Sequence, residues 1–138
     1  MSLMSTREYI ISLAQSEVGN DDPTEYFVES LGFCPANYRQ IAYCGIFCLA
    51  ILRKAGVTNL KWIISKGFLF NLKTTTDPQI GDICYYNKHQ HHAFIESIDS
   101  DLLHIINGNG TGGKVTRSVC PKNCVSAFYS IESLLTND

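Results

Sequence analysis

A continuous apolar segment in the middle of the chain restricts the possible folds most. Residues 44–52 are all apolar or glycine, the first charges after them are Arg53 and Lys54, and Gly56 follows. A helix that is apolar on every side must be buried, cations are favoured in its last turn, and glycine is favoured just past its end. We therefore predict a buried helix that begins at Cys44.

The flanking segments predict helices first and strands afterwards. Residues 5–8 have the spacing of a capping box, so a helix is expected over residues 6–18, ended by Gly19 and Pro23. A short helix and an irregular lead are expected over residues 24–42, and a turn over 77–82. Alternating segments then predict strands over residues 83–86, 93–98, 102–106, 114–118 and 125–129. This order predicts the α+β class, with N-terminal helices packed on an antiparallel sheet of about five strands.

Length and charge narrow the classes of protein. A chain of 138 residues with 45% hydrophobic and 17% charged residues suits one globular domain, which we assign to residues 5–138, with residues 1–4 as an expression scar. A net charge of −2 with scattered cations argues against nucleic-acid binding. No apolar stretch is long enough to span a bilayer, and no signal-peptide pattern is present. We expect synthesis in the cytoplasm and, for an extracellular target, non-classical export, lysis or phage delivery.

Cys44 is the candidate nucleophile among six cysteines, which we expect to be mostly reduced. A helix N-terminus favours the thiolate because its unpaired N–H groups and the helix dipole attract negative charge. Cys48 lies one turn later among apolar residues, and a buried cysteine behaves as a small, inert hydrophobe. The alternative for Cys44 is the same packing role.

A histidine at the start of a strand is the candidate general base. His92 directly precedes the apolar segment 93–95, so the sheet would hold it while its ring faces a cleft. His89 and His91 are expected to be solvated loop residues, and His104 to be structural.

The imidazole also needs a group that accepts its second N–H. Asn107 is preferred, and Asn109 is a second polar member, although an Asn-Gly pair is also a favoured hairpin turn. For the oxyanion, the Cys44 N–H is the simplest donor. Gln40 is a weaker candidate with a solvated loop role as its alternative. Tyr43 belongs to a set of aromatic residues that could line a substrate groove or be core residues.

Together these residues carry a family resemblance. Residues 43–47, the turn at 81–83, residues 92–95 and residues 107–109 resemble, in order and spacing, a CHAP domain, the cysteine, histidine-dependent amidohydrolase/peptidase of phage lysins, related to NlpC/P60 proteins. The resemblance implies a papain-like fold and cleavage of an amide in peptidoglycan, within the peptide or between sugar and peptide. It implies that Cys44 is the nucleophile and His92 its base. Asn107 stands where many members carry an acidic residue.

Other functions remain open at this stage. Cys120 and Cys124 have a spacing that zinc sites permit, and Cys34, Cys84 or the histidines could complete a zinc- or disulfide-stabilised binding module. A papain-like acyltransferase or an inactive wall-binding protein is a further alternative. The hydrolase hypothesis requires no cofactor, and its expected partners are a peptidoglycan peptide or glycopeptide and a possible inhibitor or delivery protein.

Overall fold

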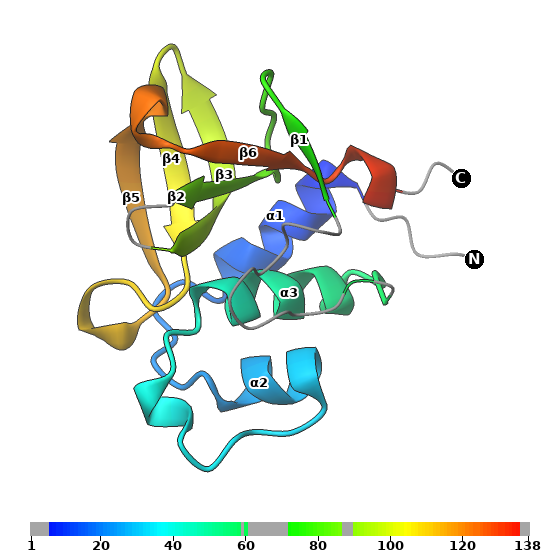
Figure 1. Ribbon diagram of the computed structural model, residues 1–138, viewed down its shortest axis with the longest axis vertical. Helices are drawn as coiled ribbons and strands as arrows, with labels where there is room; N and C mark the ends of the chain where they lie inside the picture. The colour runs from blue at the N-terminus through cyan, green and yellow to red at the C-terminus, as the bar shows by residue number, and fades with distance from the viewer. Residues whose placement is uncertain (1–5, 59, 61–71, 87–89, 136–138) are drawn as a thin grey trace.

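The computed structural model describes residues 6–58, 60, 72–86 and 90–135, and within these the chain has an α+β fold (Figure 1). The helices are α1 (Arg7–Ser16), α2 (Thr24–Leu31) and α3 (Cys44–Lys54). The strands are β1 (Lys73–Thr75), β2 (Ile83–Tyr86), β3 (His91–Asp99), β4 (Leu102–Asn107), β5 (Thr116–Pro121) and β6 (Ala127–Ser130). They form one antiparallel sheet in the order β1-β6-β2-β3-β4-β5.

The predicted class and element order are confirmed, with local differences. The described sheet has six strands rather than five. The additional strand is β1, which the sequence did not predict because it is only three residues long, lacks apolar alternation and pairs with β6 at the edge. Strand β3 begins at His91, two residues earlier than expected. Helix α1 is capped by Thr6, whose hydroxyl accepts the Tyr9 N–H; Ser5, the other residue that the capping pattern offers, lies outside the described residues.

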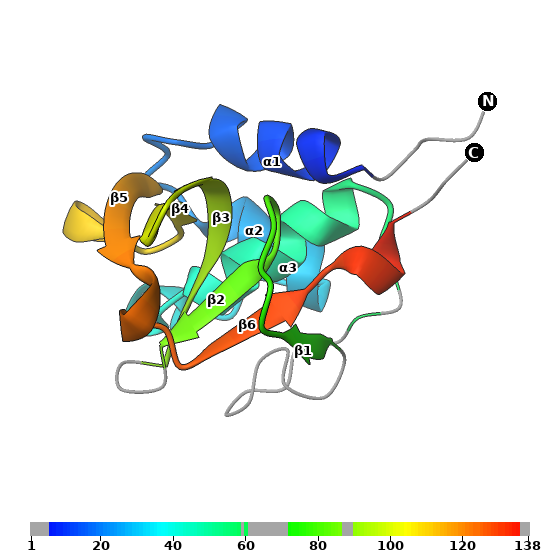
Figure 2. The same cartoon turned by 90° about the horizontal axis from the view of Figure 1, so that it is seen from above.

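Helix α3 is the centre of the hydrophobic core, as predicted. Residues 44–52 are all buried, and α3 packs against α2, α1 and β3 (Figures 1 and 2). Phe47 contacts the rings of Tyr26 and Phe94 edge to face, with centroids 5.1 and 6.1 Å away. The helix therefore joins α2 to the middle of the sheet.

The other face of the sheet has a smaller core of its own. It is formed by Cys84, Ala93, Ile95, Leu103 and Ile105. The sheet curls over this core (Figure 2), so that the Tyr86 hydroxyl on β2 is hydrogen-bonded to the Cys120 thiol on β5, although two strands separate β2 from β5. This curl lets β2 and β5 border the same cleft.

A buried carboxylate fixes the turn before β2 to both ends of the described chain. Asp82 is 1% exposed and accepts hydrogen bonds from the Arg7 guanidinium, the Gln79 N–H and the Ile131 N–H, at 2.8, 2.8 and 3.0 Å. Arg7 also forms an ion pair with Glu132 at 2.8 Å. Helix α1, the start of β2 and the end of β6 are thereby held together by one side chain.

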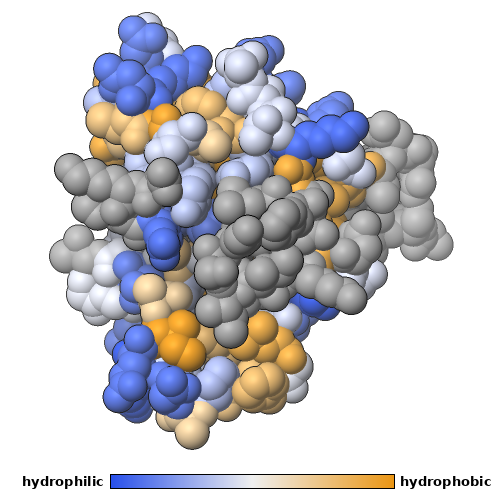
Figure 3. All heavy atoms as spheres, viewed as in Figure 1, coloured by the Kyte–Doolittle hydropathy of each residue, from blue (hydrophilic) through white to orange (hydrophobic). Residues whose placement is uncertain are grey.

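The molecular surface is mixed in polarity (Figure 3). Apolar surface includes part of α2, where Val28 is 50% exposed, and Phe33 beyond it, which is 60% exposed. Among the described helices, none combines the length and apolarity that crossing a membrane requires.

We expect Asp82→Ala to lower the free energy of unfolding by about 3 kcal/mol, because it leaves the buried Ile131 N–H without its acceptor and removes the ion pair between Arg7 and Asp82. Chemical denaturation measures this change. Asp77→Ala, in the exposed turn nearby, is the matched control and should change stability by less than about 0.5 kcal/mol. Equal effects of the two substitutions would contradict the structural role of Asp82.

Candidate active site

A cleft of about 440 Å³ opens over the N-terminus of α3. It is lined by Ala42, Cys44, Tyr86, Gln90, His91, Ile105, Asn107, Asn109, Ser118 and Cys120. Cys44 is the first residue of α3 and is 6% exposed. Because the lining includes Cys44, its sulfur is approached from this cleft, and the helix dipole favours a negative charge there.

His91 and Asn107 come from neighbouring strands. Phe94 pairs with Ile106, so the start of β3 lies beside the end of β4. The His91 Nε2 and Asn107 Oδ1 atoms are 2.7 Å apart. Directly after Asn107 the backbone passes against α3, where a Cβ on Gly108 would lie 2.5 Å from the Phe47 Cβ. Glycine at this position allows the end of β4 to approach α3.

The other contacts of Asn107 determine which way its amide faces. Its Nδ2 donates to the Ser118 hydroxyl at 2.9 Å and to the Thr116 carbonyl at 3.5 Å. A carbonyl oxygen only accepts, so the amide nitrogen must face β5 and Oδ1 must face His91. His91 Nε2 is then the protonated donor, which leaves Nδ1 for the hydrogen bond between His91 and Cys44.

The environment favours an ionised thiol. Burial alone raises the pKa of Cys44, but the hydrogen bond with the His91 side chain, the neighbouring His92 side chain and N–H, and the positive charge of His91 lower it to about 6, from an ordinary 9.0. Burial lowers the pKa of His91, and its hydrogen bonds to Cys44 and Asn107 together with the thiolate charge raise it overall. The pair therefore favours thiolate and imidazolium together near neutral pH.

The geometry favours His91 rather than His92 as the histidine of the site. His92 is buried and its ring packs on Tyr85, with centroids 4.8 Å apart. It interacts with the Cys44 thiol but does not line the cleft. The expectation that His91 is a solvated loop residue is wrong, because β3 begins at His91 and its side chain is half-buried. His89 lies outside the described residues.

The weaker candidates are distributed around the cleft. Asn109 is exposed, has a left-handed φ of 56° and lines the cleft wall. Tyr43 precedes Cys44, is buried, and donates from its hydroxyl to the Gly113 carbonyl. Gln40 is exposed in a short helix (Tyr38–Gln40) and is not part of the cleft lining.

The remaining cysteines are free thiols with other environments. Cys48 is fully buried, which confirms its expected core position, and burial raises its pKa well above the ordinary value. Burial raises the pKa of Cys84 to about 12. Within the described residues, no three His, Cys, Asp or Glu side chains are grouped so that they could hold a metal ion.

Ser118 is a site residue that the sequence did not reveal. Asn107 pairs with Thr116 across β4 and β5, so Ser118 is its diagonal neighbour on the same face of the sheet. Only the strand register identifies this contact. An isolated serine in an edge strand has no distinctive pattern.

No family model matches this chain, and no curated protein matches it. Among solved structures, the chain is similar to "Ly7917 with the hydrolyzing product of MDP", with a TM-score of 0.50 and 17% identity. It is also similar to Ly7917 alone, with a TM-score of 0.47 and 17% identity. Each likeness covers 91% of this chain and 62% of the other chain. At 17% identity, the first of these likenesses shows a similarity of fold alone.

Alkylation tests the ionisation of Cys44. We expect iodoacetamide to modify Cys44 at a rate that rises with pH through about 6, because the thiolate is the nucleophile. His91→Ala should move this midpoint toward 9.0 and slow modification at pH 7 by about tenfold. Mass spectrometry of the Cys44 peptide separates it from the other thiols. His104→Ala is the matched histidine control; an equal effect there would contradict the pairing of Cys44 with His91.

Ser118 should act as a positioning residue. In Ser118→Ala the Asn107 Nδ2 group loses the closer of its two acceptors. We therefore expect the alkaline limb of a pH–rate profile to shift to lower pH, because the imidazolium is held less well. We expect kcat/KM of the reaction at Cys44 to fall about tenfold. Ser118→Thr keeps the hydroxyl and should restore both values. Loss of activity with an unchanged pH profile would indicate a purely structural role.

Proposed function

We propose that this protein is a cysteine hydrolase of the papain-like kind that cleaves an amide bond in peptidoglycan. The observation that carries the proposal is that three side chains from separate elements meet at one cleft: Cys44 at the start of α3, His91 on β3 and Asn107 on β4. A nucleophile, a base and a group that orients the base are the parts that covalent acyl transfer requires. In this proposal the base is His91, in place of the His92 favoured by the sequence.

The first chemical step is attack on the substrate carbonyl. The Cys44 thiolate adds to the carbonyl carbon, and the C=O electron pair moves to oxygen to give a tetrahedral oxyanion. The Cys44 N–H at the first position of α3 is available as a donor for this oxygen, since the first N–H groups of a helix have no partner within it.

The amide bond then breaks with proton transfer from His91. The imidazolium gives its proton to the leaving nitrogen, so a neutral amine departs and an acyl-thioester remains on Cys44. Water then attacks the thioester while neutral His91 accepts its proton, and the thiolate leaves. Through both steps Asn107 Oδ1 accepts a hydrogen bond from the Nε2–H group and so keeps Nδ1 directed at the sulfur.

The assignment of the substrate draws on two likenesses. One is the resemblance of the site motifs to the CHAP family. The other is the fold likeness to Ly7917, which was crystallised with the hydrolysing product of MDP. Both support an amide in a wall peptide, in an endopeptidase or an N-acetylmuramoyl-L-alanine amidase reaction.

Purified protein incubated with peptidoglycan tests this proposal. We expect soluble products whose combined mass has gained one water for each amide bond broken, identified by mass spectrometry, and we expect none from Cys44→Ala. His91→Gln should lower kcat by about 100-fold or more, because it removes the proton donor and acceptor. His92→Gln should lower it much less.

The variants also separate the alternatives. Turnover that survives Cys44→Ala would refute the proposal, and a larger loss in His92→Gln than in His91→Gln would return the base to His92. Products that carry an added amine instead of water, in the presence of an amine acceptor, would indicate an acyltransferase. Circular dichroism of each variant confirms that the fold is retained.

A further inference from the structure

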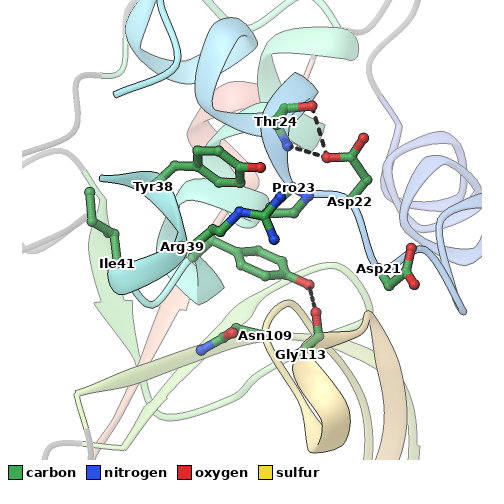
Figure 4. Close-up of a pocket in the computed structure, with 10 residues that line it drawn as sticks. Asp21, Asp22, Pro23, Thr24, Tyr38, Arg39, Ile41, Asn109 and Gly113 are labelled. Carbon is green, nitrogen blue, oxygen red and sulfur yellow. Dashed lines mark hydrogen bonds between the residues drawn. The ribbon is translucent and has the colours of Figure 1, made fainter. Parts of the chain in front are cut away.

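A second cleft of about 460 Å³ adjoins the candidate active site (Figure 4). It is lined by Asp21, Asp22, Pro23, Thr24, Tyr38, Arg39, Ile41, Tyr43, Asn109 and Gly113. Asp21 and Asp22 lie on one side of Arg39, and Tyr38 and Ile41 on the other (Figure 4). We refer to it as the charged cleft.

The charged cleft and the catalytic cleft share a wall. Asn109 lines both. In the segment that leads into α3, Ile41 and Tyr43 line the charged cleft, whereas Ala42 and Cys44 line the catalytic cleft. A peptide whose scissile bond lies at Cys44 therefore has direct access to the charged cleft on one side of that bond.

The acidic wall is held in place by a network of hydrogen bonds. The Asn20 side chain donates to the Tyr26 hydroxyl at 2.8 Å, and this hydroxyl donates to Glu17 at 2.7 Å. The backbone carbonyl of Asn20 accepts a hydrogen bond from the Val115 N–H at 3.0 Å, and the side-chain oxygen of Asn20 accepts one from the Asp22 N–H at 3.1 Å. The segment that carries Asp21 and Asp22 is thus tied to both α2 and the sheet before any ligand arrives.

The opposite wall is fixed to the nucleophile helix. The Tyr43 hydroxyl donates to the carbonyl of Gly113, at the end of the short helix Thr111–Gly113. The Arg39 guanidinium lies over the Tyr38 ring, 5.2 Å from its centroid. A site with fixed walls loses little conformational entropy when a ligand binds.

The charges of this cleft are complementary to those of an amino-acid zwitterion. Asp22 accepts hydrogen bonds from the Thr24 N–H and hydroxyl on one oxygen, at 3.1 and 2.9 Å. These bonds, together with the charge of Arg39, hold the pKa of Asp22 below its usual range, so the carboxylate is ionised at neutral pH. Two carboxylates and one guanidinium give the cleft acceptors for an ammonium group and donors for a carboxylate.

We propose that the charged cleft is a substrate subsite for a peptide segment that carries a free ammonium group, which Asp21 and Asp22 bind, and a carboxylate, which Arg39 binds. The inference rests on the proposed hydrolase function and adds a substrate class to it. The ammonium is that of an amino terminus or of a diamino-acid side chain. Both offer the same chemistry to the two carboxylates.

A cycle of substrate and protein changes tests the subsite. The probes are a synthetic lysine-containing stem tetrapeptide and its Nα-acetyl, Nε-acetyl and carboxamide forms, compared by kcat/KM. We expect acetylation of one amine to cost the wild-type protein about tenfold, and to cost the Asp21→Asn/Asp22→Asn variant nothing further. The amine that shows this coupling identifies the source of the ammonium. In the same way, replacing the carboxylate of the peptide by a carboxamide should lower kcat/KM of the wild type about tenfold and should cost the Arg39→Gln variant nothing further.

Matched controls lie just outside the cleft. Glu25→Gln/Glu29→Gln removes two exposed carboxylates of α2, and Lys54→Gln removes an exposed cation of α3; both should leave the effects of acetylation and amidation unchanged. If acetylation of neither amine costs the wild type more than it costs the double aspartate variant, the subsite is refuted while the hydrolase proposal stands.

Binding separates failure of the subsite from failure of the hydrolase. Calorimetry with Cys44→Ala measures the affinity of the same peptides without turnover. If acetylation of the peptide weakens its binding about tenfold only in the protein that retains Asp21 and Asp22, the subsite is supported. This holds even where the wild type shows no hydrolysis. Affinity that is independent of these residues overturns it.

Discussion

The burial of α3 on every side is the constraint on which the site depends. Because residues 44–52 are all buried, the helix has one position between α2 and the sheet, and its first residue is placed beside the starts and ends of the central strands. A thiolate at such a buried position loses hydration, and this raises its free energy unless a positive charge compensates. The fold that fixes Cys44 thus also creates the need for a cation next to it.

His91 meets that need, and the sheet determines its state. In a strand, successive side chains face opposite sides, so the neighbouring residues His91 and His92 have different surroundings. One faces the cleft and Asn107, and the other packs on Tyr85 in the core. Since β5 fixes the Asn107 amide, the tautomer of His91 follows from hydrogen bonds two strands away from it. The reactivity of the thiol is therefore a property of three paired strands.

The sequence was sufficient for the class, the order of the elements and the buried helix that begins at Cys44, because the periodicity and capping of residues are local properties. It was not sufficient to choose between His91 and His92, since that choice depends on whether β3 begins at residue 91 or 93, and the apolar pattern starts only at Ala93. Ser118 depends on register between strands, and β1 on an edge pairing with residues more than fifty positions later. Such information lies in the tertiary structure.

The loop after β4 borders both clefts, because its residue Asn109 lines each of them. Its beginning is held by the close approach of Gly108 to Phe47, and its end by the hydrogen bond from Tyr43 to Gly113. Tyr43 is the residue directly before α3, and Phe47 lies in the first turn of this helix, which also carries Cys44. The wall between the two clefts is therefore attached at both ends to the start of α3. For this reason the distance between the sulfur and the charged cleft is set by the fold, and a peptide bound in that cleft would present the same bond to Cys44 each time.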